Sequence, residues 1–481
     1  MTQHDGSESL GAVSDQVSRE RALLAIVAEL VKELRQQSKR PVDISLSSRL
    51  ERDLGIDSLG RTELMLRIER AFHARLPIEV LSEAETVDDI LKALERVPAI
   101  PGVVAAAPPS APLLPLVEAP VEARTLVEVL EWHVARHPDR LHLTVLQDEN
   151  TILGTLTYAE LANGARKVAA GLAAADIVPQ DRIALMLPTG LDFFIAFFGV
   201  LYAGAVPVPI YPPMQLAKIE EFMRRQAGIL RNAGARILVT VPEGLRFAVL
   251  LRRQVPSIEA VESVQSLSSA HAEIPPPVAH DSAATALIQY TSGSTGDPKG
   301  VVLSHANLLA NIRAIGEAVE ATSAEVFVSW LPLYHDMGLI GAWLGSLYFA
   351  ASFYVMSPVS FLARPASWLW AMHRFHATIS AAPNFAFEMS AVKIDDADLR
   401  GLDLSALKMV ANGAEPVSVS TLRRFTERFA PYGFRPEAMA PVYGLAENAV
   451  AVTLPPLGRR PIIDRVSRDA LSNGKAEPAR K

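Results

Sequence analysis

Residues Tyr290 to Gly300 carry the side chains whose types and spacing are best suited to chemistry, and they read Tyr-Thr-Ser-Gly-Ser-Thr-Gly-Asp-Pro-Lys-Gly. Hydroxyl groups donate hydrogen bonds, glycines let the backbone come close to a ligand, and a lysine adds a mobile positive charge. A phosphate is bound by groups of these three kinds. A flexible glycine and serine turn without a ligand is the plainer alternative, but so dense a run of special residues favours a phosphate-binding loop.

The flanking sequence predicts that this loop joins two strands, 285–289 and 301–303, the second of which leads into a helix. The commonest nucleotide loop, Gly-x-x-x-x-Gly-Lys-Ser/Thr, does not fit, because Pro298 precedes Lys299 and Gly300 follows it. The stretch instead resembles the phosphate loop of the adenylate-forming enzymes, a superfamily that contains acyl-CoA ligases, fatty acyl-AMP ligases and peptide-synthetase adenylation domains. This resemblance implies that ATP is bound by Thr291, Ser292, Gly293, Ser294, Thr295, Gly296 and Lys299.

A second motif lies at Trp330 to Gly338 and reads Trp-Leu-Pro-Leu-Tyr-His-Asp-Met-Gly. Taken alone, His335 is more often a structural loop residue. The whole motif resembles the histidine motif that lines the acyl carboxylate end of the site in adenylate-forming enzymes. Its His-Asp-Met-Gly form, continued by Leu-Ile-Gly, is similar to the fatty acyl-AMP ligases rather than to the amino-acid-activating branch.

The third motif, Asn412-Gly-Ala-Glu-Pro416, follows an apolar strand. A tight glycine turn there lets backbone groups approach a flat ligand, whereas a turn that starts a helix with Pro416 in its first position is the plainer alternative. The resemblance implies that Gly413, Ala414 and Glu415 border the adenine.

The fourth motif, Tyr443-Gly-Leu-Ala-Glu447, ends a predicted strand. A single carboxylate is ordinarily solvated surface. In the family the aromatic side chain stacks on adenine and the glutamate holds magnesium, so the resemblance assigns Tyr443 and Gly444 to ATP, and Glu447 with Thr291 to Mg²⁺. The next two residues are Asn-Ala instead of the Ala-Thr common in fatty acyl-AMP ligases, so a phosphate contact from that hydroxyl is not carried over.

These motifs combine into one reaction. Activation of a carboxylic acid requires in-line attack on the α-phosphate of ATP, in which two anions that repel each other are oriented and neutralised. Lys299, the loop hydroxyls and Mg²⁺ on Glu447 would supply the positive field. We therefore expect Lys299, His335 and Glu447 to be catalytic. The apolar residues 338–356 are candidates for the walls of an acyl tunnel, with core packing as the alternative.

The N-terminal part of the chain, residues 18–96, predicts a small helical bundle from three helix-forming stretches. Its inward-facing residues are Leu23, Val27, Leu30, Val31, Leu34, Leu64, Ile68, Phe72, Ile90, Leu91 and Leu94, and Thr86-Val-Asp-Asp89 is a capping box. The stretch Leu54-Gly-Ile-Asp-Ser-Leu59 resembles the acyl carrier proteins, in which the matching serine, Ser58 here, carries 4'-phosphopantetheine. Ser58 or Asp57 is equally suited to cap a helix, and the two roles are compatible.

Residues 97–122 are rich in proline and alanine, which predicts a semi-stiff linker that spans roughly 70 Å. From 123 to 481, strands alternate with helices, which predicts an α/β fold with mainly parallel sheets and ligands at the carboxyl ends of the strands. This region resembles the large adenylation subdomain. No Thr-Gly-Asp motif follows Glu447, so we expect the C-terminal lid, with its catalytic lysine, to be missing from these 481 residues.

Composition limits the other possibilities. The chain has 49% hydrophobic residues, 21% charged residues and a net charge of −7, which argues against a nucleic-acid partner. It has no cysteine, so any thiol must be imported.

The start of the chain lacks the features of a secretory signal, which predicts a cytoplasmic protein. The apolar stretches 193–206 and 338–361 are interrupted by Pro or Gly and are expected to be core elements instead of membrane spans.

The sequence thus predicts a fatty acyl-AMP ligase fused to its own carrier domain. It would make acyl-AMP from ATP and a fatty acid and load the phosphopantetheine arm in lipid or polyketide biosynthesis, with a phosphopantetheinyl transferase and acyl-accepting enzymes as partners. Two alternatives stay open: a non-catalytic module that binds nucleotide or acyl chain and presents a carrier, and an acyl-CoA ligase.

Overall fold

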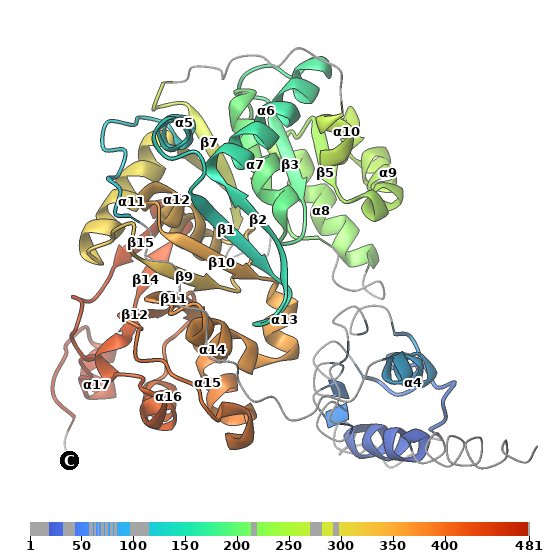
Figure 1. Ribbon diagram of the computed structural model, residues 1–481, viewed down its shortest axis with the longest axis vertical. Helices are drawn as coiled ribbons and strands as arrows, with labels where there is room; N and C mark the ends of the chain where they lie inside the picture. The colour runs from blue at the N-terminus through green and yellow to red at the C-terminus, as the bar shows by residue number, and fades with distance from the viewer. Residues whose placement is uncertain are drawn as a thin grey trace, which may run out of the picture. The chain divides into compact units, whose positions relative to one another are not determined.

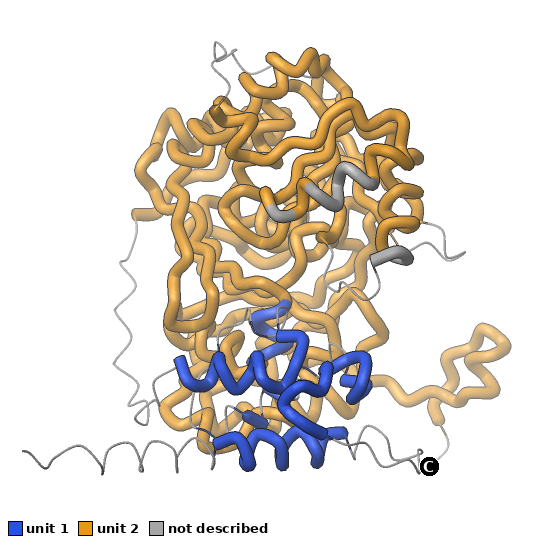
Figure 2. The backbone as a smooth tube through the Cα atoms, turned by 90° about the vertical axis from the view of Figure 1, so that its right-hand side faces the viewer, with its two compact units in different colours: residues 1–107, 213–219, 359–364 blue, residues 108–212, 220–358, 365–481 orange. Residues whose placement is uncertain are grey.

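The computed structural model describes residues 19–31, 44–56, 84–96, 115–212, 219–269, 281–291 and 298–479, with 61, 64–65, 67–68, 72, 76 and 80 between them. The chain forms two compact units, one made of residues 1–107, 213–219 and 359–364 and the other of residues 108–212, 220–358 and 365–481 (Figure 2). Each unit buries apolar side chains of its own.

The first unit contains the predicted helical bundle. A helix over 19–31 buries Leu23, Val27, Leu30 and Val31, and Leu64 and Ile68 are buried in the helical stretch that follows. The helix α4 (Val87–Arg96) buries its apolar face at Val87, Ile90, Leu91 and Leu94. Leu34, Asp57 and Ser58 lie outside the described residues, so the carrier and capping roles of Ser58 stay predictions.

The capping box at the start of α4 is confirmed. The N–H of Asp89 donates to the Thr86 hydroxyl at 3.3 Å, and the Asp89 carboxylate accepts from the N–H of Thr86 at 2.9 Å. Because these bonds satisfy N–H groups that no helical carbonyl can reach, they fix where the helix begins.

The second unit is built on a seven-stranded sheet in the order β13-β12-β11-β9-β10-β1-β2 (Figure 1). All neighbours pair in parallel except β1 and β2, so the predicted parallel architecture is confirmed. The strands are β1 (Leu141–Leu146), β2 (Ile152–Thr157), β9 (Val326–Ser329), β10 (Ser352–Met356), β11 (Ile379–Pro383), β12 (Met409–Gly413) and β13 (Met439–Pro441).

A second, four-stranded sheet is parallel throughout, in the order β4-β3-β5-β6. Its strands are β3 (Arg182–Met186), β4 (Val206–Pro209), β5 (Ile237–Thr240) and β6 (Ala260–Glu262). The helix α7 (Leu191–Tyr202) contacts β3 and β4 of this sheet and β2 of the larger sheet, and it packs along α6 (Tyr158–Ala174). The α7 helix therefore joins the cores of the two sheets.

The apolar character of α7 reflects burial on all sides. Its Phe194 and Phe197 rings pack against Trp343 with centroids 4.7 and 5.2 Å apart. A helix that is hydrophobic all round belongs in a core of this kind. Among the described residues, none of the helices has the length and apolar character needed to cross a membrane.

Residues 115–123, at the end of the predicted linker, follow the surface of the second unit without forming a helix or strand. Val117 donates its N–H to the Ser323 hydroxyl at 2.8 Å, and Arg140 donates to the carbonyl of Pro115 at 2.8 Å. These residues are bound to the second unit, and residues 97–114 lie outside the described part of the chain.

The other helices are mostly short and cover the sheets or connect their strands. They are α5 (Leu126–Arg136), α8 (Ile219–Ala233), α9 (Leu245–Gln254), α10 (Val264–Ser268), α11 (His305–Ala318), α12 (Gly345–Phe349), α13 (Pro358–Ala363), α14 (Pro365–Arg374), α15 (Asn384–Lys393), α16 (Val419–Phe429) and α17 (Arg468–Ser472).

Candidate active site

The predicted phosphate loop is carried by an antiparallel hairpin of β7 (Thr285–Thr291) and β8 (Lys299–Ser304). Thr291 and Lys299 are cross-strand partners, so the hydroxyl and the ammonium group predicted to bind ATP lie opposite each other where the loop leaves the sheet. The N-cap Ser304 then begins α11, as predicted. The loop residues Ser292, Gly293, Ser294, Thr295 and Gly296 lie outside the described residues, and their contacts stay predictions.

Glu447 is held beside this hairpin. It lies in the 3₁₀ turn η7 (Ala446–Asn448), which joins the short strands β14 (Tyr443–Leu445) and β15 (Val450–Thr453) and lies against β8. Glu447 is solvent-exposed. Mg²⁺ prefers oxygen ligands and is usually bound by one or two carboxylates together with phosphates and waters. An open carboxylate next to the strand of Lys299 fits that requirement.

The hairpin of β14 and β15 needs glycine at 444. A Cβ on Gly444 would lie 1.9 Å from the carbonyl oxygen of Val450, so the strands could not pair with any other residue there. Tyr443 is 62% exposed, which leaves one face of its ring open for stacking on a flat ligand. The amide of Asn448 donates to the carbonyl of Ala451 and so belongs to the turn itself.

The turn after β12 brings backbone close to the same region. A Cβ on Gly413 would lie 2.7 Å from the Val442 side chain, and Ala414 has a φ of +66°, a left-handed conformation. Glu415 accepts a 2.6 Å hydrogen bond from the N–H of Phe385, so its carboxylate ties this turn to the start of α15. The alternative of a helix starting at Pro416 is wrong, because α16 begins at Val419.

His335 lies at the start of a π-helix, η3 (Met337–Leu344). Its Nδ1 is 2.8 Å from Oδ1 of Asp336 and 3.4 Å from the N–H of Met337. The contact with Asp336 needs a proton on Nδ1, whereas the contact with the N–H of Met337 needs Nδ1 without one. The shorter contact favours a proton on Nδ1 that is donated to Asp336. The ring is half exposed, and that tautomer presents Nε2 as an acceptor. The π-helix itself is an arrangement often found at functional sites.

Gln289 is a site residue that the sequence analysis placed in a strand without assigning it a role. Its side chain is buried in β7, and its Nε2 donates to the carbonyl of Tyr334 at 2.7 Å. This bond links the strand that enters the phosphate loop to the residue just before His335. A glutamine within an otherwise apolar strand was the available signal.

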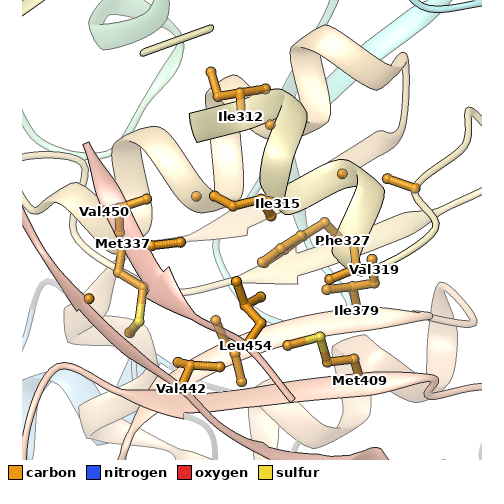
Figure 3. Close-up of a pocket in the computed structure, with 18 of the residues that line it drawn as sticks. Ile312, Ile315, Val319, Phe327, Met337, Ile379, Met409, Val442, Val450 and Leu454 are labelled. Atoms are coloured by element: carbon orange, nitrogen blue, oxygen red, sulfur yellow. The ribbon is translucent and has the colours of Figure 1, made fainter. Parts of the chain in front are cut away.

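A cavity of about 240 Å³ opens between these motifs, and its labelled side chains are aliphatic, aromatic or thioether groups (Figure 3). Its roof comes from α11 and η3, and its floor from β9, β11 and β12. On the floor, Phe327, Ile379 and Met409 form a row across three neighbouring strands, and Ala381 and Ala411 form the next row toward the strand ends. The small alanines leave room near His335.

Four of the predicted site residues line this one cavity: His335, Ala414, Tyr443 and Gly444. Gly413 and Glu415 flank Ala414 in the chain. Lys299 and Glu447 lie on β8 and η7, two elements that contact each other, and neither residue lines the cavity. The structure therefore brings residues from three of the four motifs into one cavity at the carboxyl ends of β9, β12 and β13, where the parallel-sheet rule places ligands. The cavity combines a polar mouth, suited to a nucleotide and a carboxylate, with an apolar interior.

Comparison with known proteins agrees with this arrangement. Residues 130–471 match the family described as AMP-binding enzyme, and residues 21–94 match the phosphopantetheine attachment site family. The long-chain-fatty-acid–AMP ligase FadD32 of Mycolicibacterium smegmatis is 38% identical over 66% of this chain and 51% of its own length. The long-chain-fatty-acid–AMP ligase FadD26 of Mycobacterium marinum is 35% identical over 75% of this chain and 63% of its own.

A solved structure is similar in the same region. The fatty acyl-adenylate ligase from L. pneumophila, in complex with acyl adenylate and pyrophosphate, superposes with a TM-score of 0.66 at 34% identity, covering 75% of this chain and 62% of that one. The chain spans about half to just under two thirds of the length of the curated relatives named here. With a family match over residues 130–471 and a carrier match before it, the chain belongs to the AMP-binding enzymes and carries a phosphopantetheine-type carrier domain.

Proposed function

We propose that this protein activates a fatty acid with ATP to form acyl-AMP and loads the acyl group onto the phosphopantetheine arm of its carrier domain. The observation that supports this most is the apolar 240 Å³ cavity whose mouth is lined by His335, Ala414 and Tyr443. An alkyl chain fits the interior, which would leave its carboxylate at the polar mouth. Relatives named for fatty-acid–AMP ligation at 35 to 38% identity support the same reaction.

In this proposal each described residue has a task. Lys299, opposite Thr291 at the base of the phosphate loop, attracts the phosphates of ATP. Tyr443 stacks on the adenine, and Glu447 with Thr291 would hold Mg²⁺, which would offset the repulsion between the two anions. His335 accepts a hydrogen bond through Nε2 at the reacting end of the cavity. The apolar walls hold the acyl chain in place and exclude water from it.

Loading requires the carrier domain. Ser58 would receive the phosphopantetheine arm from a phosphopantetheinyl transferase, and the arm's thiol would attack the acyl carbonyl of acyl-AMP, forming a thioester and releasing AMP. Enzymes that accept acyl groups in lipid or polyketide biosynthesis would then use the thioester. The cytoplasm, where ATP is available, is the compartment expected for this reaction.

The first step is tested by exchange of labelled pyrophosphate into ATP. We expect exchange that depends on added fatty acid and falls about a hundredfold in Lys299→Ala and in Glu447→Ala, because each removes charge stabilisation from the transition state. Lys475→Ala and Glu477→Ala make the same changes at exposed positions near the end of the described chain and should leave exchange unchanged. No exchange with any fatty acid would contradict a self-sufficient ligase.

The second step has its own readout. Incubation of the phosphopantetheinylated chain with ATP and a fatty acid should add one acyl mass to the carrier domain, measured by mass spectrometry. Ser58→Ala should abolish the added mass and leave pyrophosphate exchange intact. If the acyl group instead appeared on added coenzyme A and not on the carrier, the protein would be an acyl-CoA ligase.

A further inference from the structure

The cavity has two chemically different ends. His335, Asp336 and Tyr443 are at the mouth, and beyond the row of Phe327, Ile379 and Met409 at the other end is Glu325. Glu325 precedes β9 by one residue, and its carbonyl accepts from the N–H of Ser352, so it continues the edge of the sheet. Side chains two residues apart on a strand share a face, which puts Glu325 on the same face as Phe327.

Among the described residues that line the cavity, Glu325 and Asp336 are the two carboxylates, and Glu325 is the one at the end away from His335. It is 2% exposed. Its Oε1 accepts a 2.5 Å hydrogen bond from Nζ of Lys408, whose side chain is half exposed to solvent. Its Oε2 has no hydrogen-bond partner among the described residues.

The ion pair with Lys408 accounts for only one of the two carboxylate oxygens of Glu325. Lys408 precedes β12 as Glu325 precedes β9, so the pair ties together the beginnings of two strands that flank β11. That structural role needs one carboxylate oxygen. Leaving the second oxygen buried and unpaired costs free energy, because a buried acceptor that loses its water and gains nothing in return is unfavourable. A donor carried by a ligand would recover that free energy.

We propose that Glu325 is a specificity determinant for the far end of the acyl chain, and that the cavity prefers carboxylic acids with a terminal hydroxyl group over those that end in methyl. The hydroxyl would donate to Oε2 of Glu325 while the carboxylate lies at His335. This inference rests on the proposed function, since it assumes that the acid occupies the cavity in that orientation.

The length of such an acid follows from the strand geometry. Phe327 and Met409 share a row, and Glu325 lies two residues beyond it, so from the level of Glu325 to Ala414 the floor covers seven residues, roughly 23 Å at about 3.3 Å per residue. Three bonds of an extended chain cover about 3.8 Å, so a chain of about eighteen carbon atoms would span the floor. A hydroxyl at the end of such a chain would arrive near Glu325.

The test uses acyl-adenylate analogues in which a sulfamate replaces the phosphate, so that binding is measured without turnover. Each pair has tails of about sixteen, eighteen or twenty carbons that end in methyl or in hydroxyl, and Kd on the full chain is measured by calorimetry. A hydrogen bond to a carboxylate predicts that one hydroxyl-ended analogue binds about tenfold to hundredfold more tightly than its methyl partner.

Two variants connect the preference to this residue. Glu325→Leu should reverse the preference, because the hydroxyl would then be buried without a partner. Glu325→Gln keeps the size of the side chain and should reduce the preference, which covers the case in which the leucine variant does not fold. Because the preference is a ratio of two Kd values on one protein, it does not depend on the fraction of active protein.

The outcomes separate the two proposals. Equal or weaker binding of the hydroxyl-ended analogues at all three lengths, with the methyl-ended ones bound, would overturn the inference and leave the proposed function standing. A hydroxyl preference that survives unchanged in both variants would overturn the assignment to Glu325. If no analogue bound at any length, the proposed function would fail and this inference with it.

Discussion

At the scale of single residues, the cavity owes its space to positions that have no side chain. Gly341 lines it from the π-helix, and a Cβ there would have only Val450 as a neighbour, at 3.9 Å. Gly316, on α11, serves a different purpose, because a Cβ there would lie 1.9 Å from the ring of Phe349. The first glycine leaves open space and the second makes room for an aromatic wall.

Substitution at Gly341 should therefore change which length of fatty acid the protein accepts, without unfolding the protein. A leucine side chain in Gly341→Leu would extend into the 240 Å³ cavity and exclude part of a long acyl chain. We expect kcat/KM for pyrophosphate exchange with a long-chain acid to fall about tenfold or more, while a short acid that stays near the mouth is activated at the original rate.

The control for this prediction is Gly228→Leu. Gly228 lies on the exposed side of α8, and a Cβ there would meet no atom within 4 Å, so the same change adds bulk outside the cavity. It should leave the chain-length profile as it was. Equal losses for short and long acids in Gly341→Leu would show that the π-helix had been distorted and that the cavity does not hold the acyl chain.

At the scale of elements, β7 supports two parts of the site at once. It leads into the predicted phosphate loop, and Gln289 within it donates to the carbonyl of Tyr334 just before His335. Gln289→Met keeps the volume and removes Oε1, which is buried without a partner among the described residues, but it also removes the donor and leaves that carbonyl unpaired, at a net cost of about 1 kcal/mol in the free energy of unfolding. We expect this loss in urea unfolding, together with slower exchange, since His335 loses its anchor.

Gln226 offers a matched comparison within α8. It is also fully buried, yet neither atom of its amide has a hydrogen-bond partner among the described residues. Gln226→Met should therefore be neutral or stabilising in the same urea experiment, because it removes polar atoms that gain nothing from burial. If both variants lost stability equally, the bond to Tyr334 would not be what holds Gln289 in place.

The element scale is also where sequence reasoning succeeded most. Apolar patterns located β7, β8 and the helix α11 that follows them, and the capping box at Thr86 to Asp89 correctly marked the start of α4. The π-helix was beyond reach, because its hydrogen bonds differ from those of an α-helix by one residue, which apolar periodicity does not resolve. The use of Glu415 as a tie to Phe385 was hidden for a similar reason, since it depends on where two turns meet.

At the scale of the whole molecule, the site is assembled by pairing between strands that are far apart in the chain. Four motifs resembled those of a known family, so their residues could be named in advance and four of them share one cavity. Glu325 belongs to no motif. Its position at the end of the cavity away from His335 follows from the register of β9, β11 and β12, and strand register across a parallel sheet is not written in any one segment.

A buried histidine pair joins α5, β1 and α6. His133 of α5 and His142 of β1 stack on either side of Tyr158, with ring centroids 4.4 and 4.9 Å apart. The Nε2 of His142 accepts from the indole N–H of Trp343 at 3.0 Å. Burial lowers the pKa of each histidine to about 3, and repulsion from nearby His137 and Arg140 contributes to the lowered pKa of His133.

These histidines should make the protein sensitive to acid. Their pKa values are about 3 when folded and about 6.5 when unfolded, so the unfolded chain binds more protons between these two values. The stability that depends on these two neutral histidines is fully present above about pH 6.5 and is lost as the pH falls toward 3. Each histidine should lower the free energy of unfolding by about 1.4 kcal/mol for every pH unit within that window.

The measurement is urea unfolding at several pH values between 4 and 6.5, on the wild type and on His142→Gln, which keeps an acceptor for Trp343. The slope of the free energy of unfolding against pH should be smaller in His142→Gln than in the wild type by the contribution of one histidine, about 1.4 kcal/mol per pH unit. His376→Asn is the control, because His376 is exposed with a φ of +50°, which asparagine tolerates, and its slope should match the wild type. An unchanged slope in His142→Gln would mean that this histidine is protonated in the folded protein, and that its contact with Trp343 is not the one the neutral ring makes.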